Sequence, residues 1–234
     1  MERESTQCYA PDNGGTIMEY LKRKGKKAHH PSPGSDRGFT LVELMIAMAV
    51  GLVLLGAMYG VFTMHNKIFG TQEQIAEMQQ TARTAMDMMT REIRMAGYDP
   101  LGSAGAGVVS AASNAINFTL DITDNAGTGS SDGDTGDSNE NITYSLYTPV
   151  DGIQKLGRKS TASATNEPVA EHVQSLAFQY RDASGTITTV AANVRRIQVA
   201  LTVRTARPDP DYAPNSGYRT YTLTSIITPR NLGL

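Results

Sequence analysis

Cysteine and tryptophan are scarce in this chain of 234 residues, which has one cysteine, Cys8, and no tryptophan. A single cysteine cannot close a disulfide within one chain, so the fold has to rest on an apolar core. Aromatic residues make up only 6% of the chain, too few to indicate an aromatic-lined ligand groove. The formal net charge is −2, and no basic patch of the kind that marks nucleic-acid binding is evident.

Enzyme motifs are also missing from the sequence. It has no nucleophile elbow, phosphate-binding loop, metal-ligand spacing or cofactor fingerprint. The four histidines do not converge on a metal, and His172 stands alone at the start of a predicted strand. We therefore expect neither an enzyme nor a bound cofactor.

Charge is absent from Leu44 to Asn66, a run of 23 residues without Asp, Glu, Lys or Arg. As a helix rising about 1.5 Å per residue, this run spans roughly 34 Å, enough to cross a hydrocarbon core of about 30 Å. A single span has to satisfy its own backbone hydrogen bonds in lipid, so it must be helical. The sequence predicts one transmembrane helix at about residues 41–64.

Basic residues precede this span: Lys22, Arg23, Lys24, Lys26, Lys27 and Arg37. The positive-inside rule places their end of the chain in the cytoplasm and the C-terminal bulk outside it. A secretory signal peptide is the competing interpretation. Its cleavage site would follow its apolar core, whereas Gly38 comes before the apolar run.

Glu43 is a carboxylate at the membrane edge, where a charge is costly unless it finds a cation. A cut after Gly38 would create an amine on Phe39, one helical turn from Glu43. The carboxylate could then pair with the amine of its own chain or with that of a neighbouring subunit. The alternative is an interfacial glutamate whose side chain reaches water.

The segment Gly38–Ala47, GFTLVELMIA, resembles the class III signal of type IV prepilins and type II secretion pseudopilins. This resemblance implies cleavage after Gly38 by a membrane prepilin peptidase, N-methylation of Phe39 and a subunit-docking role for Glu43. Residues 1–38 would be a removed leader, or 21 residues if the chain starts at Met18. The implied partners are other minor and major pilins and an inner-membrane assembly platform, and the implied location is the inner membrane and then the pilus surface.

Beyond the span, apolar residues recur three or four positions apart, as in an amphipathic helix. They are Ile75, Met78, Ala82, Ala85, Met86, Met89 and Ile93. Gly97 and Pro100 then end the helix. We expect one helix over residues 39–98 whose outer half presents this stripe to the head.

Residues 99–234 are predicted to form a β-rich head. Segments rich in Ile, Val, Thr, Tyr and Phe indicate strands at 114–122, 141–148, 172–181, 186–191, 194–204 and 218–228. The small-residue segment 101–113 is predicted as a loop, and Asp182–Gly185 as a hairpin turn. The expected fold class is α+β, a long helix packed on an antiparallel sheet.

The Gly- and Ser-rich stretch 124–140 contains a cluster of polar and acidic residues: Asp132, Asp134, Asp137, Asn139 and Glu140. Carboxylates on such a loop can bind Ca²⁺, but their order does not fit the EF-hand loop. We therefore favour a solvated, flexible loop without a metal, and keep the three aspartates as Ca²⁺ candidates.

Several later segments resemble PilW-like minor pilins, with the type II secretion minor pseudopilin GspJ as a near neighbour. They are Met89–Tyr98, Val173–Tyr180, Val194–Leu201 and the tail Pro229–Leu232. This resemblance implies a low-abundance subunit that helps to initiate or cap pilus assembly. A secretion pseudopilin and a membrane-tethered binding domain are the alternatives, although a tether needs neither Gly38 before the span nor Glu43 inside it.

Overall fold

A computed structural model describes residues 38–163 and 165–233. The six basic residues from Lys22 to Arg37 therefore lie outside the described residues. The chain divides into two compact units, one ending at Ala57 and one beginning at Met58, which are considered separately. Helix α1 (Leu41–Met95) contributes to both.

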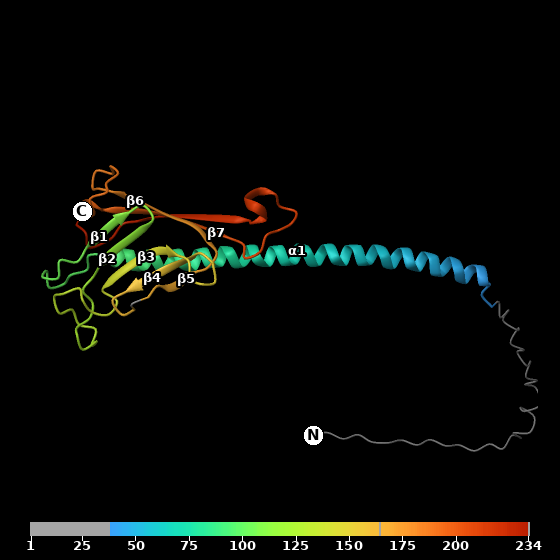
Figure 1. Ribbon diagram of the computed structural model, residues 1–234, viewed down its shortest axis with the longest axis horizontal. Coiled ribbons are helices and arrows are strands. Elements are labelled where there is room, and N and C mark those ends of the chain that lie inside the picture. Colours follow the sequence, from blue (N-terminus) through green and yellow to red (C-terminus); the bar gives the residue numbers. More distant parts are fainter. Residues whose placement is uncertain (1–37, 164, 234) are drawn as a thin grey trace, which may run out of the picture. The chain divides into compact units, whose positions relative to one another are not determined.

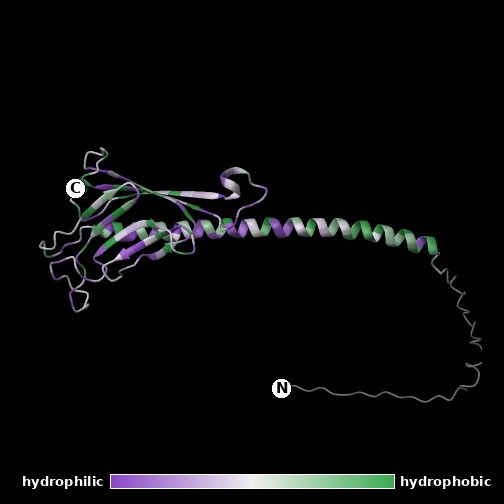
Figure 2. Cartoon of the chain, viewed as in Figure 1, coloured by the Kyte–Doolittle hydropathy of each residue, from purple (hydrophilic) through white to green (hydrophobic). Residues whose placement is uncertain are grey.

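In the first unit, the described part is the start of α1, and its side chains are almost all exposed. Figure 2 shows that this part of the helix is largely hydrophobic. Among the described residues, α1 alone is long and apolar enough to cross a membrane, judged by length and composition.

The described residues of the second unit combine the rest of α1 with eight antiparallel strands in two sheets (Figure 1). The five-stranded sheet contains, in order, β1 (Val108–Ala112), β2 (Ala115–Thr119), β3 (Asn141–Tyr147), β4 (Lys155–Ser160) and β5 (Glu167–Ala170). The three-stranded sheet contains β6 (Val173–Arg181), β7 (Arg196–Arg204) and β8 (Thr220–Ile227). The α+β class is thus confirmed, but the β-strands form two sheets where one was expected.

The core of the second unit lies where α1 meets the sheets. Of the seven apolar residues in the predicted stripe, six are buried and Ile75 is partly buried against them. Strand β7 alternates as expected, because Ile197, Val199, Leu201 and Val203 are buried while the residues between them are not. Burial of these apolar side chains is the main driving force for docking the helix on the sheets.

Helix α1 ends at Met95, and Gly97 just beyond it has a φ of 80°, in the left-handed region that favours glycine. A Cβ there would lie 2.5 Å from the Leu232 side chain. The tail that contains Leu232 also caps the helix, because the Arg230 N–H donates to the Arg94 carbonyl oxygen at 3.0 Å. Two segments that carry the pilin resemblance, Met89–Tyr98 and Pro229–Leu232, therefore meet at this end of the helix.

The strand predicted at 186–191 is wrong. Only one isolated bridge forms, between Arg181 and Ile187, and Ala191–Asn193 is a short 3₁₀ helix. Residues 186–191 can pair with the edge of β6 only near Tyr180. Farther along that edge, the Phe178 N–H already donates to the Ser113 carbonyl oxygen at 2.7 Å. The hairpin turn itself is present, with a hydrogen bond from the Asp182 N–H to the Thr186 carbonyl oxygen.

Three strands lie outside the predicted set. Strand β1 falls within the expected small-residue loop, and β4 and β5 fall in a segment with no strand prediction. In β4, Gly157 packs so closely on Tyr147 that a Cβ would lie 2.7 Å from the tyrosine ring. Cross-strand pairing, rather than the residues' own preference, accounts for these strands.

Candidate processing and docking site

The start of α1 is capped by three reciprocal hydrogen bonds between Thr40 and Glu43. The backbone N–H and the hydroxyl of Thr40 each donate to the Glu43 Oε2 at 2.9 Å. In return, the Glu43 N–H donates to the Thr40 hydroxyl oxygen at 3.2 Å. This is a capping box, which satisfies backbone donors that the first turn of a helix leaves free.

The capping box gives Glu43 a defined position before any cleavage. Its carboxylate points back toward the N-terminal end of the helix, where the helix dipole favours a negative charge. Phe39, one residue before the box, is 91% exposed. Gly38 is also exposed, and a Cβ added there would meet nothing within 4 Å.

Gly38 and Phe39 therefore lie just ahead of α1, and Glu43 lies in its first turn. A peptidase could reach the exposed Gly38–Phe39 bond from outside the helix. The sequence analysis overlooked the part played by Thr40. The Thr-x-x-Glu spacing ahead of an apolar run is a recognised signature of this cap and would have revealed it.

In the second unit, a buried polar cluster joins α1 to the five-stranded sheet. The Glu92 carboxylate on α1 accepts a hydrogen bond from the Tyr144 hydroxyl at 2.7 Å and from the Arg158 Nε at 3.0 Å. The Arg158 side chain is 9% exposed, and Tyr144 is fully buried. Burial and the nearby Glu92 carboxylate raise the pKa of Tyr144, so its hydroxyl stays protonated and donates.

Replacing Glu92 by alanine should destabilise the second unit by about 3 kcal/mol, since it leaves the buried Tyr144 hydroxyl without its acceptor and Arg158 without its closest carboxylate. Arg158 would keep its hydrogen bond to Asn139. The free energy of unfolding can be measured by denaturant titration of the full chain in detergent. Glu77→Ala, an exposed change on the same helix, is the control and should cost no more than about 0.5 kcal/mol. Equal unfolding free energies for the two variants would contradict the role of Glu92.

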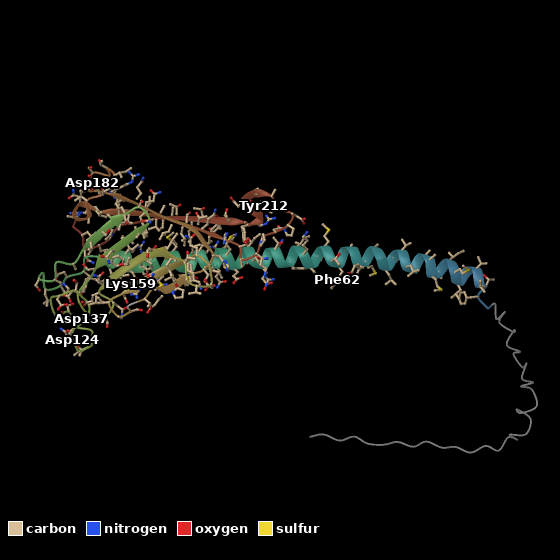
Figure 3. The ribbon with its side chains drawn as sticks, in the orientation of Figure 1. Phe62, Asp124, Asp137, Lys159, Asp182 and Tyr212 are labelled. Atoms are coloured by element: carbon tan, nitrogen blue, oxygen red, sulfur yellow. The ribbon has the colours of Figure 1, made fainter. Side chains whose placement is uncertain are left out.

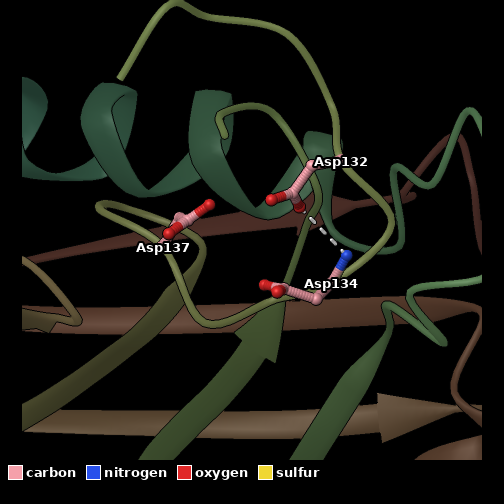
Figure 4. A group of neighbouring side chains, drawn as sticks. All are labelled: Asp132, Asp134 and Asp137. Carbon is pink, nitrogen blue, oxygen red and sulfur yellow. Dashed lines mark hydrogen bonds between the residues drawn. The ribbon is translucent and has the colours of Figure 1, made fainter. Parts of the chain in front are cut away.

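The three aspartates proposed as Ca²⁺ candidates do lie together on the loop between β2 and β3. Carboxylate oxygens of Asp132, Asp134 and Asp137 lie within 4.8 Å of one another (Figure 4). Figure 3 marks the same loop by Asp124 and Asp137. Burial, reinforced by the charge of Asp132, raises the pKa of Asp137. Clustered carboxylates of this kind are common on exposed loops without an ion, so the three aspartates stay Ca²⁺ candidates and a loop without a metal stays the favoured prediction.

Two other carboxylates hold this loop against the sheet. Glu140, which was expected on a solvated loop, is fully buried and accepts hydrogen bonds from the N–H groups of Ile122 and Thr123 at 2.8 Å. Asp121 is also fully buried and accepts from the N–H groups of Asp132 and Gly133. Buried carboxylates are tolerated here because backbone donors solvate them.

His172 is half-buried, with a positive φ of 55° immediately before β6. Its carbonyl oxygen accepts from the Arg204 N–H at 2.9 Å. The clustered metal-type side chains in the described residues are the three loop aspartates, and His172 is not among them. Its contacts indicate a structural position at the strand start.

Comparisons with known proteins bear on both units. Residues 34–59 match the family described as the prokaryotic N-terminal methylation motif. Residues 71–227 match the family described as prepilin peptidase-dependent protein B. No curated protein matches the chain.

Among solved structures, the chain is similar to a type IV-like pilin, TTHA1219, from Thermus thermophilus, with 14% sequence identity and a TM-score of 0.45. The alignment covers 66% of this chain and 98% of that pilin.

The second family match extends over more than half of the sequence, and the first contains Gly38, Phe39 and Glu43 at the start of an apolar helix. The chain belongs to the prepilin peptidase-dependent protein B family, and it is a type IV pilin-like protein whose apolar N-terminal helix fits a single-pass membrane anchor.

Proposed function

We propose that this chain is a minor type IV pilin of the PilW-like kind, with a structural role in assembly and no catalytic one. In this proposal a prepilin peptidase cuts after Gly38, the new amine of Phe39 is methylated, and residues 1–38 are lost. Residues at about 41–64 hold the subunit in the inner membrane, and residues 99–234 form the head outside the cytoplasm.

One observation carries the proposal. Gly38 and Phe39 are exposed directly ahead of a capped apolar helix, in a chain that matches an N-terminal methylation motif and a prepilin peptidase-dependent protein family. Cleavage at this bond removes nothing from the capping box, since Thr40 and Glu43 both remain. The mature helix would therefore keep its N-terminal capping box, with Phe39 as the single residue ahead of it.

Glu43 is the proposed docking residue. On the free subunit its only described hydrogen-bond partner is Thr40. A cleaved Phe39 on a neighbouring subunit would supply a cation that Thr40 cannot. Pairing of the two would neutralise both charges in lipid and fix the axial register between this subunit and other pilins added through an inner-membrane assembly platform.

The proposal is tested by the N-terminal residue and mass of the protein isolated from membranes and from sheared surface filaments. We expect a chain that starts at N-methylated Phe39 in both fractions, with far less of it than of the major subunit in filaments. A processed chain absent from surface filaments would favour the secretion pseudopilin instead. An intact N-terminus, or a cut beyond the apolar run, would overturn the proposal in favour of a tether or a secreted domain.

A further inference from the structure

Among the described residues of the second unit, three of the four sheet edges are protected. Strand β5 has four residues, including Glu167 and Pro168, and its pairing with β4 contains an irregularity. Strand β1 has five residues and a register shift against β2. Short strands, proline, charge and bulges are the usual devices that prevent another chain from pairing with an edge.

The edge of β6 is covered by other parts of the head. The Phe178 N–H donates to the Ser113 carbonyl oxygen, and the Thr188 N–H donates to the Tyr180 carbonyl oxygen at 3.0 Å. In addition, the Tyr180 hydroxyl donates to the carbonyl oxygens of Ala112 and Ala115 at 2.9 Å. This edge is therefore closed by the β1–β2 hairpin and the turn after β6.

Strand β8, the red strand in Figure 1, lacks all of these devices. It has eight residues, Thr-Tyr-Thr-Leu-Thr-Ser-Ile-Ile, without charge, proline or glycine, and it pairs with β7 in unbroken register from end to end. Its residues are mainly β-branched or aromatic, which favours extended backbone. Ile226 is 66% exposed on the outer face.

The free backbone groups of β8 can be identified from its pairing. The Thr205 N–H donates to the Arg219 carbonyl oxygen at 2.9 Å, just before β8 begins. Antiparallel pairs alternate in hydrogen bonding, so the odd-numbered residues of β8 point their backbone groups at β7. The N–H and C=O groups of the even-numbered residues point away from the sheet: Thr220, Thr222, Thr224 and Ile226. Among the described residues, no backbone group bonds to these four from outside the sheet.

The charged residues within the three strands of this sheet have one sign. Strands β6, β7 and β8 contain no Asp or Glu, and their charged residues are Arg181, Arg196 and Arg204. Arg196 and Arg204 lie at the two ends of β7, on the same face as the exposed threonines of β8. Among the described carboxylates, none forms an ion pair with either arginine, and Arg204 lies over the Tyr218 ring at 4.3 Å.

An added strand would lie two strand spacings, roughly 10 Å, from β7. Arginine and glutamate side chains can span that separation together. The inward side chains of such a strand would cover Tyr221 and Leu223, which pack against the core but remain partly exposed. A second copy of β8 would bring only more arginines to the same face, so charge disfavours self-pairing.

We propose that the β8 edge receives an extended segment of a partner protein as a fourth strand, and that this segment has an uncharged, β-branched centre with a carboxylate near each end. Backbone hydrogen bonds to the four even-numbered residues supply the pairing, and Arg196 and Arg204 select the acidic ends. This inference concerns the head alone and goes beyond the proposed processing and assembly role.

The test uses the full chain in detergent and a fluorescein-labelled peptide, Glu-Val-Thr-Val-Thr-Val-Thr-Val-Glu, whose two Glu residues share one face of an extended strand. Binding is followed by fluorescence anisotropy. Thr224→Pro removes one outward N–H and leaves the β7–β8 hydrogen bonds intact. Thr224→Val keeps that N–H and the β-branched shape, so it is the matched control. We expect Thr224→Pro to bind at least about tenfold more weakly than the wild type, and Thr224→Val to bind as the wild type does.

Charge selection is tested with the same peptide carrying Lys in place of both Glu residues, which should bind about tenfold more weakly. If Thr224→Pro does not fold, hydrogen exchange on the wild type replaces it: the peptide should protect the amides of Thr220, Thr222, Thr224 and Ile226. No binding by the wild type, equal binding by Thr224→Pro, equal binding of the Lys peptide, or unprotected amides would overturn the proposal. Self-association of the chain that Thr224→Pro abolishes would assign the edge to a second copy instead.

Discussion

A chain with Gly38→Ala is expected to accumulate as the uncut precursor, with the processed fraction reduced about tenfold or more. The reason lies in the peptidase and not in this chain. Gly38 is exposed, and a Cβ added there meets nothing within 4 Å, so alanine causes no clash in the subunit itself. One methyl group can cost a tight enzyme pocket about tenfold or more in rate. Immunoblotting of membranes separates the two forms by size.

Gly51→Ala provides the matched control for this change. Gly51 lies in the same unit, inside α1, and a Cβ there also meets nothing within 4 Å. It should be processed as the wild type is. If Gly38→Ala gave mature protein of normal size and amount, Gly38 would not be part of the processing site, whatever Gly51→Ala shows.

A chain with Glu43→Ala should be cut normally but should enter filaments about tenfold less often, because an unpaired amine at the subunit contact costs more than 1 kcal/mol. Glu43→Gln keeps an oxygen that can accept from Thr40 and loses only the charge. If charge pairing is the cause, glutamine should be as defective as alanine. The measurement is the ratio of this subunit in sheared filaments to that in membranes.

Thr40→Ala separates the capping role of Glu43 from its proposed docking role. It removes the capping hydroxyl and leaves the carboxylate, so it should fray the first turn of α1 at a cost of about 1 kcal/mol while incorporation stays near normal. Glu73→Ala, an exposed carboxylate on the same helix, controls for general loss of charge. Wild-type incorporation of both Glu43 variants would exclude the docking role.

Periodicity in the sequence was enough to predict the long helix and its packing face. The stripe from Met78 to Ile93 repeats over several turns, and such a signal survives in any tertiary context. Strands β6, β7 and β8 were also predicted, because long runs of β-branched and apolar residues carry them. Strands β1, β4 and β5 were missed, since these short segments become strands only through pairing with their neighbours β2, β3 and β4.

The residues of the candidate sites also differ in whether a local sequence pattern could predict them. Gly38, Phe39 and Glu43 lie within six consecutive residues, so their pattern is local and can be read from sequence. Arg158 and Glu92 are 66 positions apart, and no local pattern connects them. Glu140 was predicted to lie on a solvated loop, like the aspartates near it. Its burial could not be predicted, because it depends on the N–H groups of Ile122 and Thr123, which only the folded chain brings to it.

The cap at the far end of α1 has a consequence for the order of folding. The Asn231 side chain donates to the Met95 carbonyl oxygen, a contact that spans 136 positions and joins the helix to residues beyond the last strand. Contacts between distant positions are entropically costly and form slowly. We therefore expect the helix end to stay open while the sheets assemble, and the head to close only once this final segment has reached it. An extension fused at the C-terminus would act on this last step, so a detection tag belongs in an exposed turn such as Asp182–Gly185 instead.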